Sequence, residues 1–390
     1  MFVNFYINLP WQIQNYTGMF HTILILSYLI PNVYLFVRIW QLFIPKECRI
    51  QYVLIYALLF SVYPVSNMLV EGDAGPVGQI LEASVDYLLP FFLYLFLFVL
   101  LTDLLLLINL AFKIIPRDKI REKSLRVRVL IVIICFSVTV VIAGIIIFNT
   151  IRTSEYQIDV HGRSSDISRL RIAFASDFHL QESTPVRFVE RFVKEIGIVN
   201  PDLMLFGGDI VEGDREDENM LRFEKLFSQI KPKYGVFTVL GNHEFYAGQD
   251  KGSFFDKAGM TVLCDTFVVI DNSISLLGRY DSHFNTRKTI TDLIQYVSDT
   301  LPVILIDHRP TEIDQVSKTR VNIQLSGHTH NGQLFPINMI IRDIYQLSWG
   351  YEKIRNTHFF VTSGIQLWGP PVRTAGKSEI MVIEITLTGN

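Results

Sequence analysis

The chain has 390 residues, a net charge of −3 and a mean hydropathy of +0.31, which makes it more apolar than an ordinary soluble protein. The charge balance, and the lack of a basic stripe with interleaved aromatic residues in the second half, give no reason to expect a nucleic-acid partner. Cys48, Cys135 and Cys264 lie far apart, so neither a thiolate metal site nor a disulfide framework is predicted.

The apolar residues are concentrated before residue 150. Four stretches there are long enough to cross a bilayer core, which takes about 20 residues. They are residues 20–40, 52–70, 87–112 and 129–148. No basic segment precedes the first stretch and three more follow it, so it is not a cleavable signal peptide. We therefore expect residues 1–150 to form a domain of four transmembrane helices, with the lipid bilayer as a partner and a multi-pass location in the cell membrane.

The loops between these stretches predict an orientation. The first loop carries Lys46 and Arg49, residues 113–128 carry seven lysines and arginines, and residues 71–84 carry none. Basic loops stay in the cytoplasm, which places the N-terminus and everything after residue 150 outside it. Asp103 lies within the third stretch, where a charge is costly and often functional. It could instead be structural, facing the bundle interior or remaining protonated.

The second half has the composition of a globular α/β domain. Residues 151–169 are polar and are predicted to be a linker, and residues 170–390 alternate short apolar runs with amphipathic stretches. Helices are expected near 186–197 and 219–228, and residues 267–270 and 273–277 should form a hairpin. Further runs occur at 359–362 and 380–386. Five other runs, at 170–176, 203–206, 235–240, 302–306 and 321–325, each precede a cluster of Asp, Asn or His.

These five clusters predict a metal centre. In open α/β sheets, ligands bind beyond the carboxyl ends of the strands, so the clusters should converge. Carboxylate and imidazole ligands suit Mn, Fe, Zn or Co. Seven ligands can hold two ions if one carboxylate bridges them, and two such ions can promote an in-line displacement at phosphorus. The seven candidate ligands are Asp177, His179, Asp209, Asn242, His308, His328 and His330.

The same motifs resemble the calcineurin-like metallophosphoesterase superfamily, over about residues 155–388. The resemblance is carried by Asp177-x-His179, Gly208-Asp209, Gly241-Asn242-His243-Glu244, a lone His308 and Gly327-His328-x-His330. It implies a two-sheet αββα sandwich, here preceded by the four transmembrane helices. It also implies two divalent ions, of Mn, Fe or Zn with Mn favoured.

The resemblance assigns a role to each candidate. One ion would be held by Asp177, His179, Asp209 and His330, and the other by Asp209, Asn242, His308 and His328, with Asp209 bridging. His243 would bind phosphate or donate a proton, held by a carboxylate such as Asp177 or Asp209, although it could also be structural. Asp307 and Glu244 are expected to support the site rather than to bind metal.

Within the superfamily, the Gly-His-Thr-His-Asn-Gly-Gln run and Arg373 after two prolines are similar to a membrane-associated bacterial branch. That branch includes enzymes similar to UDP-2,3-diacylglucosamine hydrolases. Asn331 stands where a glycine is usual, and the four-span anchor also differs, so the substrate does not carry over. The predicted topology argues against UDP-diacylglucosamine, which is made in the cytoplasm.

A phosphorylated substrate could be bound by arginine, whose fork matches phosphate. Arg373 is the first candidate and Arg279 the second, with Arg309 a further one. The function expected is therefore that of a membrane-anchored phosphoesterase acting on a phosphoester or pyrophosphate, with a lipid head group as one candidate substrate. The alternative is a membrane sensor or binding protein whose phosphoesterase domain is vestigial.

Overall fold

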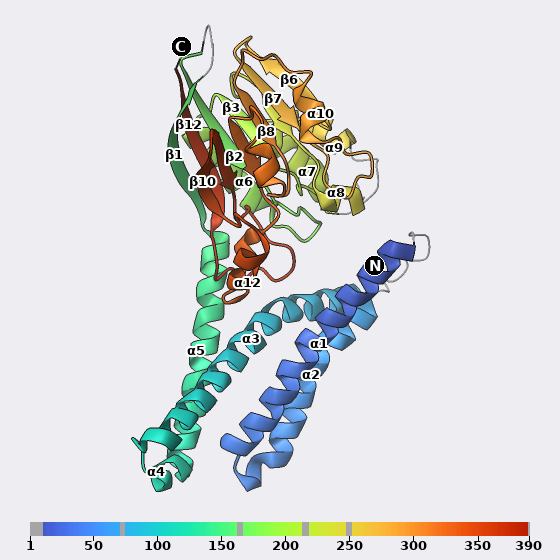
Figure 1. The fold of residues 1–390 in the computed structure, drawn as a ribbon. Coiled ribbons are helices and arrows are strands. Elements are labelled where there is room, and N and C mark those ends of the chain that lie inside the picture. The colour runs from blue at the N-terminus through green and yellow to red at the C-terminus, as the bar shows by residue number, and fades with distance from the viewer. Residues whose placement is uncertain (1–10, 71–74, 162–166, 213–217, 247–251, 389–390) are drawn as a thin grey trace. The chain divides into compact units, whose positions relative to one another are not determined.

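The computed structural model describes residues 11–70, 75–161, 167–212, 218–246 and 252–388. The chain divides into two compact units, Met1–Gly144 and Ile145–Asn390 (Figure 1). The helix α5 runs through the boundary between them, so the last residues of α5 belong to the second unit. Each unit has its own buried core and is described separately below.

The first unit consists of helices that are long and apolar enough to cross a membrane, as the sequence predicts. In the described part of the chain these are four: α1 (Trp11–Leu42), α2 (Arg49–Val70), α3 (Gly75–Phe112) and α5 (Lys123–Asn149). Two short helices, η2 (Lys46–Cys48) and α4 (Arg117–Arg121), lie in the basic loops. Many apolar side chains on the described parts of the long helices are exposed, which suits a surface solvated by lipid.

Asp103 in α3 is paired with two residues of α1. The Nε of Arg38 donates to the Asp103 carboxylate at 2.7 Å, and Arg38 Nη2 and the Tyr34 hydroxyl make further short contacts with it. A charge in an apolar helix is stabilised by such a partner. This pairing favours the structural interpretation of Asp103, because its carboxylate links two helices of the unit.

The second unit contains two six-stranded sheets (Figure 1). The first sheet has the order β1 (Ile151–His161), β12 (Ser378–Thr388), β2 (Arg169–Ala175), β3 (Leu203–Phe206), β4 (Val236–Thr238) and β5 (Thr261–Val262). The second has the order β10 (Gly350–Ile354), β11 (Thr357–Val361), β9 (Ile323–Ser326), β8 (Val303–Ile306), β7 (Ile274–Gly278) and β6 (Thr266–Ile270). The expected hairpin is the antiparallel pair β6–β7.

Apolar layers explain why the two sheets pack together. Between the sheets, Phe174 and Leu205 of the first sheet belong to the same buried cluster as Ile304 and Phe360 of the second. The other face of the first sheet is covered by α6 (Val186–Val199) and α7 (Glu218–Phe227). The short helices α10 (Ile290–Ile294) and α11 (Ile313–Val316) cover the second sheet. The predicted αββα sandwich, preceded by four apolar helices, is confirmed.

The predicted linker over 151–169 is wrong for residues 151–161, which form β1, and residues 162–166 lie outside the described part. β1 pairs in parallel with β12 along its whole length. Ser154, Ile158 and Val160 face inward, whereas Glu155 and Gln157 face solvent. An edge strand with one polar face has the composition of a linker, which is why composition alone misled the prediction.

Candidate metal centre

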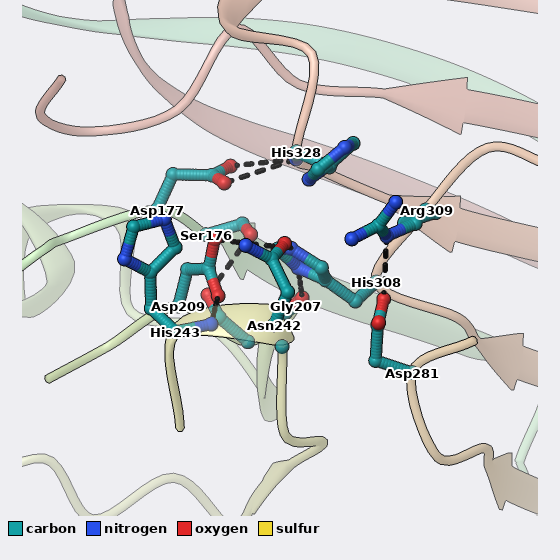
Figure 2. Close-up of polar contacts among 12 residues, drawn as sticks. Ser176, Asp177, Gly207, Asp209, Asn242, His243, Asp281, His308, Arg309 and His328 are labelled. Atoms are coloured by element: carbon teal, nitrogen blue, oxygen red, sulfur yellow. Dashed lines mark hydrogen bonds and ion pairs between the residues drawn. The ribbon is translucent and has the colours of Figure 1, made fainter. Parts of the chain in front are cut away.

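All seven candidate ligands lie at the carboxyl ends of five strands, as the sequence predicts for a site of this kind. Asp177 and His179 follow β2, Asp209 follows β3, and Asn242 follows β4. His308 follows β8, and His328 and His330 follow β9, so both sheets contribute. Figure 2 shows side chains from both sheets facing one another around Asp209.

The first group of potential ligands consists of Asp177, His179 and His330, whose ligand atoms lie within 4.8 Å of one another. The Nε2 atoms of His179 and His330 are 3.1 Å apart. Nε2 of His330 is 3.8 Å from Asp177 Oδ1, and Nε2 of His179 is 3.9 Å from Asp209 Oδ2. Two ring nitrogens this close together, facing carboxylates, are arranged to share a cation.

The second group consists of Asp209, His308 and His328, whose ligand atoms also lie within 4.8 Å of one another. Asp209 Oδ2 is 3.1 Å from His308 Nε2, and the side-chain oxygen of Asn242 is 3.3 Å from that nitrogen. Asp209 therefore reaches both groups and is placed to bridge them. The two groups are also joined by the backbone, because the His328 N–H donates to the Asp177 carboxylate at 2.9 Å.

The orientations of the histidine rings fit a pair of divalent ions. His308 Nδ1 donates to the Gly207 carbonyl at 2.7 Å, and His179 Nδ1 donates to Glu212 Oε1 at 2.7 Å, which leaves both Nε2 atoms to face the centre. Burial, reinforced by His179, holds the pKa of His330 well below its usual range, so that ring is neutral and can offer a lone pair. Burial opposes a charge on His308, but the neighbouring Asp209 raises its pKa to about 10, which marks a centre that attracts cations.

Five of the seven candidate ligands have left-handed backbone conformations, which are uncommon outside glycine. The φ angles are 59° at Asp177, 45° at His179, 52° at Asp209, 70° at His328 and 48° at His330. Such conformations cluster at functional sites, where the surrounding structure enforces them. At these positions they aim side chains from several different loops at one point.

Two glycines of the motifs are required by close contact. A Cβ added at Gly241 would lie 2.1 Å from Asp209 Oδ1, and one added at Gly327 would lie 2.4 Å from Asp177 Oδ2. Both distances are far inside van der Waals contact, so any side chain there would displace a carboxylate of the centre. This explains why glycine precedes Asn242 and His328 in the sequence.

The comparison with known proteins agrees with this geometry. Residues 170–332 match the family described as calcineurin-like phosphoesterase. These residues form a calcineurin-like phosphoesterase domain. The matching residues include all seven candidate ligands. The family uses divalent metals, which agrees with the two groups of candidate ligands in the structure.

Individual relatives carry similar names. An uncharacterized metallophosphoesterase of Helicobacter pylori is 31% identical over 55% of this chain, and the chain spans only about 60% of that relative's length. An uncharacterized metallophosphoesterase of Aquifex aeolicus is 29% identical over 62% of this chain and 94% of its own. A transmembrane protein with metallophosphoesterase domain from Danio rerio is 25% identical over 86% of this chain and 80% of its own. The four apolar helices and this last likeness favour a membrane protein.

His243 of the phosphoesterase domain is held by a carboxylate that the sequence analysis missed. Its Nδ1 lies 2.7 Å from Glu212 Oε1, so the expectation that Asp177 or Asp209 holds the ring is wrong. Asp209 instead accepts from the His243 backbone N–H at 2.9 Å. Burial opposes ionisation of Glu212, but its hydrogen bonds to His179 and His243 lower its pKa to about 2. The only sequence signal was an acidic residue three positions after Asp209.

Glu244 supports the loop that carries Asp209. Its buried carboxylate accepts from the backbone N–H groups of Asp209, Ile210, Val211 and Gly241 at distances of 2.6 to 3.1 Å. A carboxylate that satisfies four amides stabilises the loop in the conformation that the centre needs. The expectation that Glu244 supports the site without facing it agrees with this arrangement.

Arg279 and Arg373 are placed where they cannot bind a substrate, so the structure contradicts that prediction. The Arg279 side chain is 1% exposed and pairs with Asp307 at 3.1 Å and Glu312 at 2.8 Å. Arg373 is fully buried and donates to the carbonyls of residues 363, 364 and 366. Burial lowers the pKa of Arg373 to about 9. Both guanidinium groups are already occupied in holding the domain together.

Arg309, the third arginine considered from the sequence, does reach the centre. Its Nε donates to Asp281 Oδ2 at 2.8 Å, and its Nη2 is 2.8 Å from His283 Nδ1. Figure 2 shows its guanidinium beside His308 and His328. The Tyr246 hydroxyl also makes a side-chain hydrogen bond with Arg309, whose side chain is 18% exposed. Arg309 is thus held by several neighbours beside the centre and remains partly exposed.

Proposed function

We propose that the chain is a membrane-anchored phosphoesterase that uses two divalent ions, with Mn²⁺ favoured, to hydrolyse a phosphoester or pyrophosphate. The observation that supports this most strongly is the shared position of Asp209. Its carboxylate reaches His308 on one side and the His179 group on the other, and five strand ends supply the remaining ligands. A core has little use for this arrangement, because it gathers two buried carboxylates and four imidazole rings at one point.

The ions would be held by Asp177, His179, Asp209 and His330 on one side, and by Asp209, Asn242, His308 and His328 on the other. When bound, two such ions lower the pKa of a water molecule and neutralise charge on the phosphoryl oxygens. The protein supplies fixed ligand positions. Gly207 and Glu212 hold the His308 and His179 rings so that Nε2 of each faces inward, which is how outer partners tune metal ligands.

His243 and Arg309 would act on the substrate. Because Nδ1 of His243 donates to Glu212, its Nε2 is left to carry a proton to the leaving oxygen. Arg309, held in place by Asp281, would donate to a phosphoryl oxygen. Arg309 therefore replaces Arg279 and Arg373 as the proposed substrate-binding arginine.

Activity with a matched control tests this proposal. Purified full chain loaded with Mn²⁺ should hydrolyse an aryl phosphate monoester or diester, and Asp209→Asn should lower the rate by more than about 100-fold, since even changes to residues that only support metal ligands cost 10- to 100-fold. Asp299→Asn makes the same chemical change on an exposed side chain and should have no effect. If the wild type bound metal but showed no hydrolysis, the sensor or binding function would be favoured instead.

We also propose that the phosphoesterase domain lies outside the cytoplasm. The support is the distribution of charge, with basic residues in the first and third loops and none between residues 71 and 84. Reporter fusions after Arg128 and after Asn390 should report opposite sides of the membrane, with the second one outside. A cytoplasmic reporter after Asn390 would refute this orientation and return cytoplasmic lipid intermediates to consideration.

A further inference from the structure

The helix α12 (Ile337–Ile344) exposes its apolar residues and buries a polar one. Ile337, Met339, Ile340 and Ile344 are 38% to 64% exposed, whereas Asn338 is the only residue of the helix classed as buried. An ordinary surface helix has the opposite arrangement, with its apolar stripe against the core. The side of α12 that faces away from the domain is therefore built for an apolar environment.

The exposed apolar residues form a concentrated patch. Among the described residues beyond 150, twelve large hydrophobic side chains are exposed, and five of these lie between positions 335 and 344. Scattered single hydrophobic residues on a surface need no explanation, but a contiguous group indicates an interaction surface. We call this group the α12 patch: Phe335, Ile337, Met339, Ile340 and Ile344.

The α12 patch adjoins the metal centre. The turn η3 (His330–Gly332) begins with a candidate ligand, and a Cβ on Gly332 would lie 2.6 Å from the Asn338 Cα. The backbone of α12 therefore packs directly on the ligand loop. Just beyond the other end of the helix, the Tyr345 ring lies 6.2 Å from the His328 ring, measured between centroids. The patch thus lies on a helix that packs beside His330 and His328, one candidate ligand from each group.

Both flanks of α12 are attached to one segment, residues 374–379. Before the helix, the Phe335 backbone N–H donates to Thr374 Oγ1 at 2.9 Å. After it, the Trp349 indole Nε1 donates to Glu379 Oε2 at 2.9 Å. These bonds fix the place of α12 on the second unit, and Figure 1 shows it at the end of the sheets where β1 begins.

The same segment meets the end of α5. Ser378 Oγ donates to the Phe148 carbonyl at 2.6 Å, and Ser378 pairs with Ile151, the first residue of β1. Only Thr150 separates α5 from β1, so no flexible linker intervenes. α5 is long and apolar enough to cross a bilayer, and its last residues, from Ile145 on, belong to the same unit as β1. The chain therefore enters the domain from this apolar helix at the end where β1 begins. That continuity identifies the environment that the patch would meet.

We infer that the α12 patch docks on the lipid bilayer and brings the metal centre to phosphoesters of membrane lipids. An apolar helix face of this kind lies in the boundary between head groups and acyl chains. The docking depends only on the surface and on α5. The substrate class rests on the proposed function, and the two parts are tested separately.

Photocrosslinking tests the docking without any need for activity. The full chain is reconstituted in vesicles of phosphatidylcholine and phosphatidylglycerol, with p-benzoylphenylalanine in place of Ile340. A matched protein carries it in place of Ile198, which is also an exposed apolar residue, 67% exposed, but outside the patch. Mass spectrometry should find lipid adducts at position 340 and none at position 198. Equal labelling at both positions, or adducts at 340 only to a second copy of the chain, would overturn the docking.

Hydrolysis of matched substrates tests the substrate class. The double variant I340S/I344S should lower kcat/KM at least tenfold for vesicle-borne dioleoyl phosphatidic acid, diacylglycerol pyrophosphate or phosphatidylglycerol, and leave hydrolysis of a soluble aryl phosphate unchanged. Ile198→Ser should change neither rate. Hydrolysis of aryl phosphate but of none of these lipids would overturn the lipid substrate alone. If the wild type hydrolysed none of these substrates, including the aryl phosphate, but still formed lipid adducts at position 340, the proposed function would be refuted. The docking would then stand.

Discussion

Glu212 provides the sharpest test of how the metal centre is supported. One oxygen, Oε1, accepts from His179 and from His243, each at 2.7 Å, so a single carboxylate orients a candidate ligand and the proposed proton donor. The change Glu212→Gln keeps the size of the side chain and removes its charge. We expect it to weaken metal binding and proton donation together.

The magnitude follows from the two hydrogen bonds. A hydrogen bond to a charged group contributes about 1 kcal/mol more than one between neutral groups. Two such bonds give about 2 kcal/mol, which is roughly 30-fold in an equilibrium or rate constant. This falls within the range of 10- to 100-fold seen when an outer partner of a metal ligand is lost. The Mn²⁺ dissociation constant should therefore rise by roughly that factor, and kcat at saturating Mn²⁺ should also fall.

Calorimetric titration with Mn²⁺, and rates measured over a range of Mn²⁺ concentrations, separate the two effects. The control is Glu218→Gln, which makes the same change on an 80% exposed carboxylate whose partner is Arg222 on the surface. Metal affinity and kcat both within twofold of the wild type for Glu212→Gln would refute the role given to this carboxylate. Weaker metal binding with an unchanged kcat would retain the link to His179 and refute the link to His243.

Three further changes have distinct expected outcomes. Glu244→Gln should lower the free energy of unfolding by about 2–4 kcal/mol, because four backbone amides lose a charged acceptor, and thermal unfolding will measure it. Gly241→Ala should abolish metal binding, as measured by metal content, because its Cβ would overlap the Asp209 carboxylate. Arg309→Gln should raise KM about tenfold with bound metal unchanged, whereas Arg279→Met should lower the melting temperature without altering KM.

The sequence predicted the strands best where burial is complete. Residues 203–206 and 303–306 are continuous apolar runs because parallel strands inside a sandwich are covered on both faces, and every residue of both strands is buried. β1 was missed because it has one exposed face and is rich in polar residues. Its identity depends on pairing with β12, more than 200 positions later in the chain. No local pattern contains that information.

The candidate site was predictable to the extent that residue type reveals chemistry. Asp, Asn and His at strand ends pointed to the centre because few other arrangements bring those types together. The arginines failed because charge does not reveal burial. Arg373 follows two prolines and resembles a substrate ligand, yet its guanidinium satisfies three carbonyls inside the domain. Glu212 was missed because it lies in no recognisable motif. Its contacts with His179 and His243 arise only when the loops fold.

The left-handed backbone conformations of the ligands explain why residue types predicted the centre although its supporting residues were missed. A residue held in such a conformation costs on the order of 1–3 kcal/mol, and Asp, Asn and His are the types other than glycine that adopt it most readily. The five strained positions are all Asp or His. The residue types that bind divalent ions are therefore also the types that tolerate the turns needed to aim them. Glu244 stabilises one such turn through four amides, and Asp177 stabilises another by accepting from the His328 N–H. Ligand chemistry and backbone conformation thus select the same residues, and this is why a short motif can specify the centre while its supporting residues lie outside the motif.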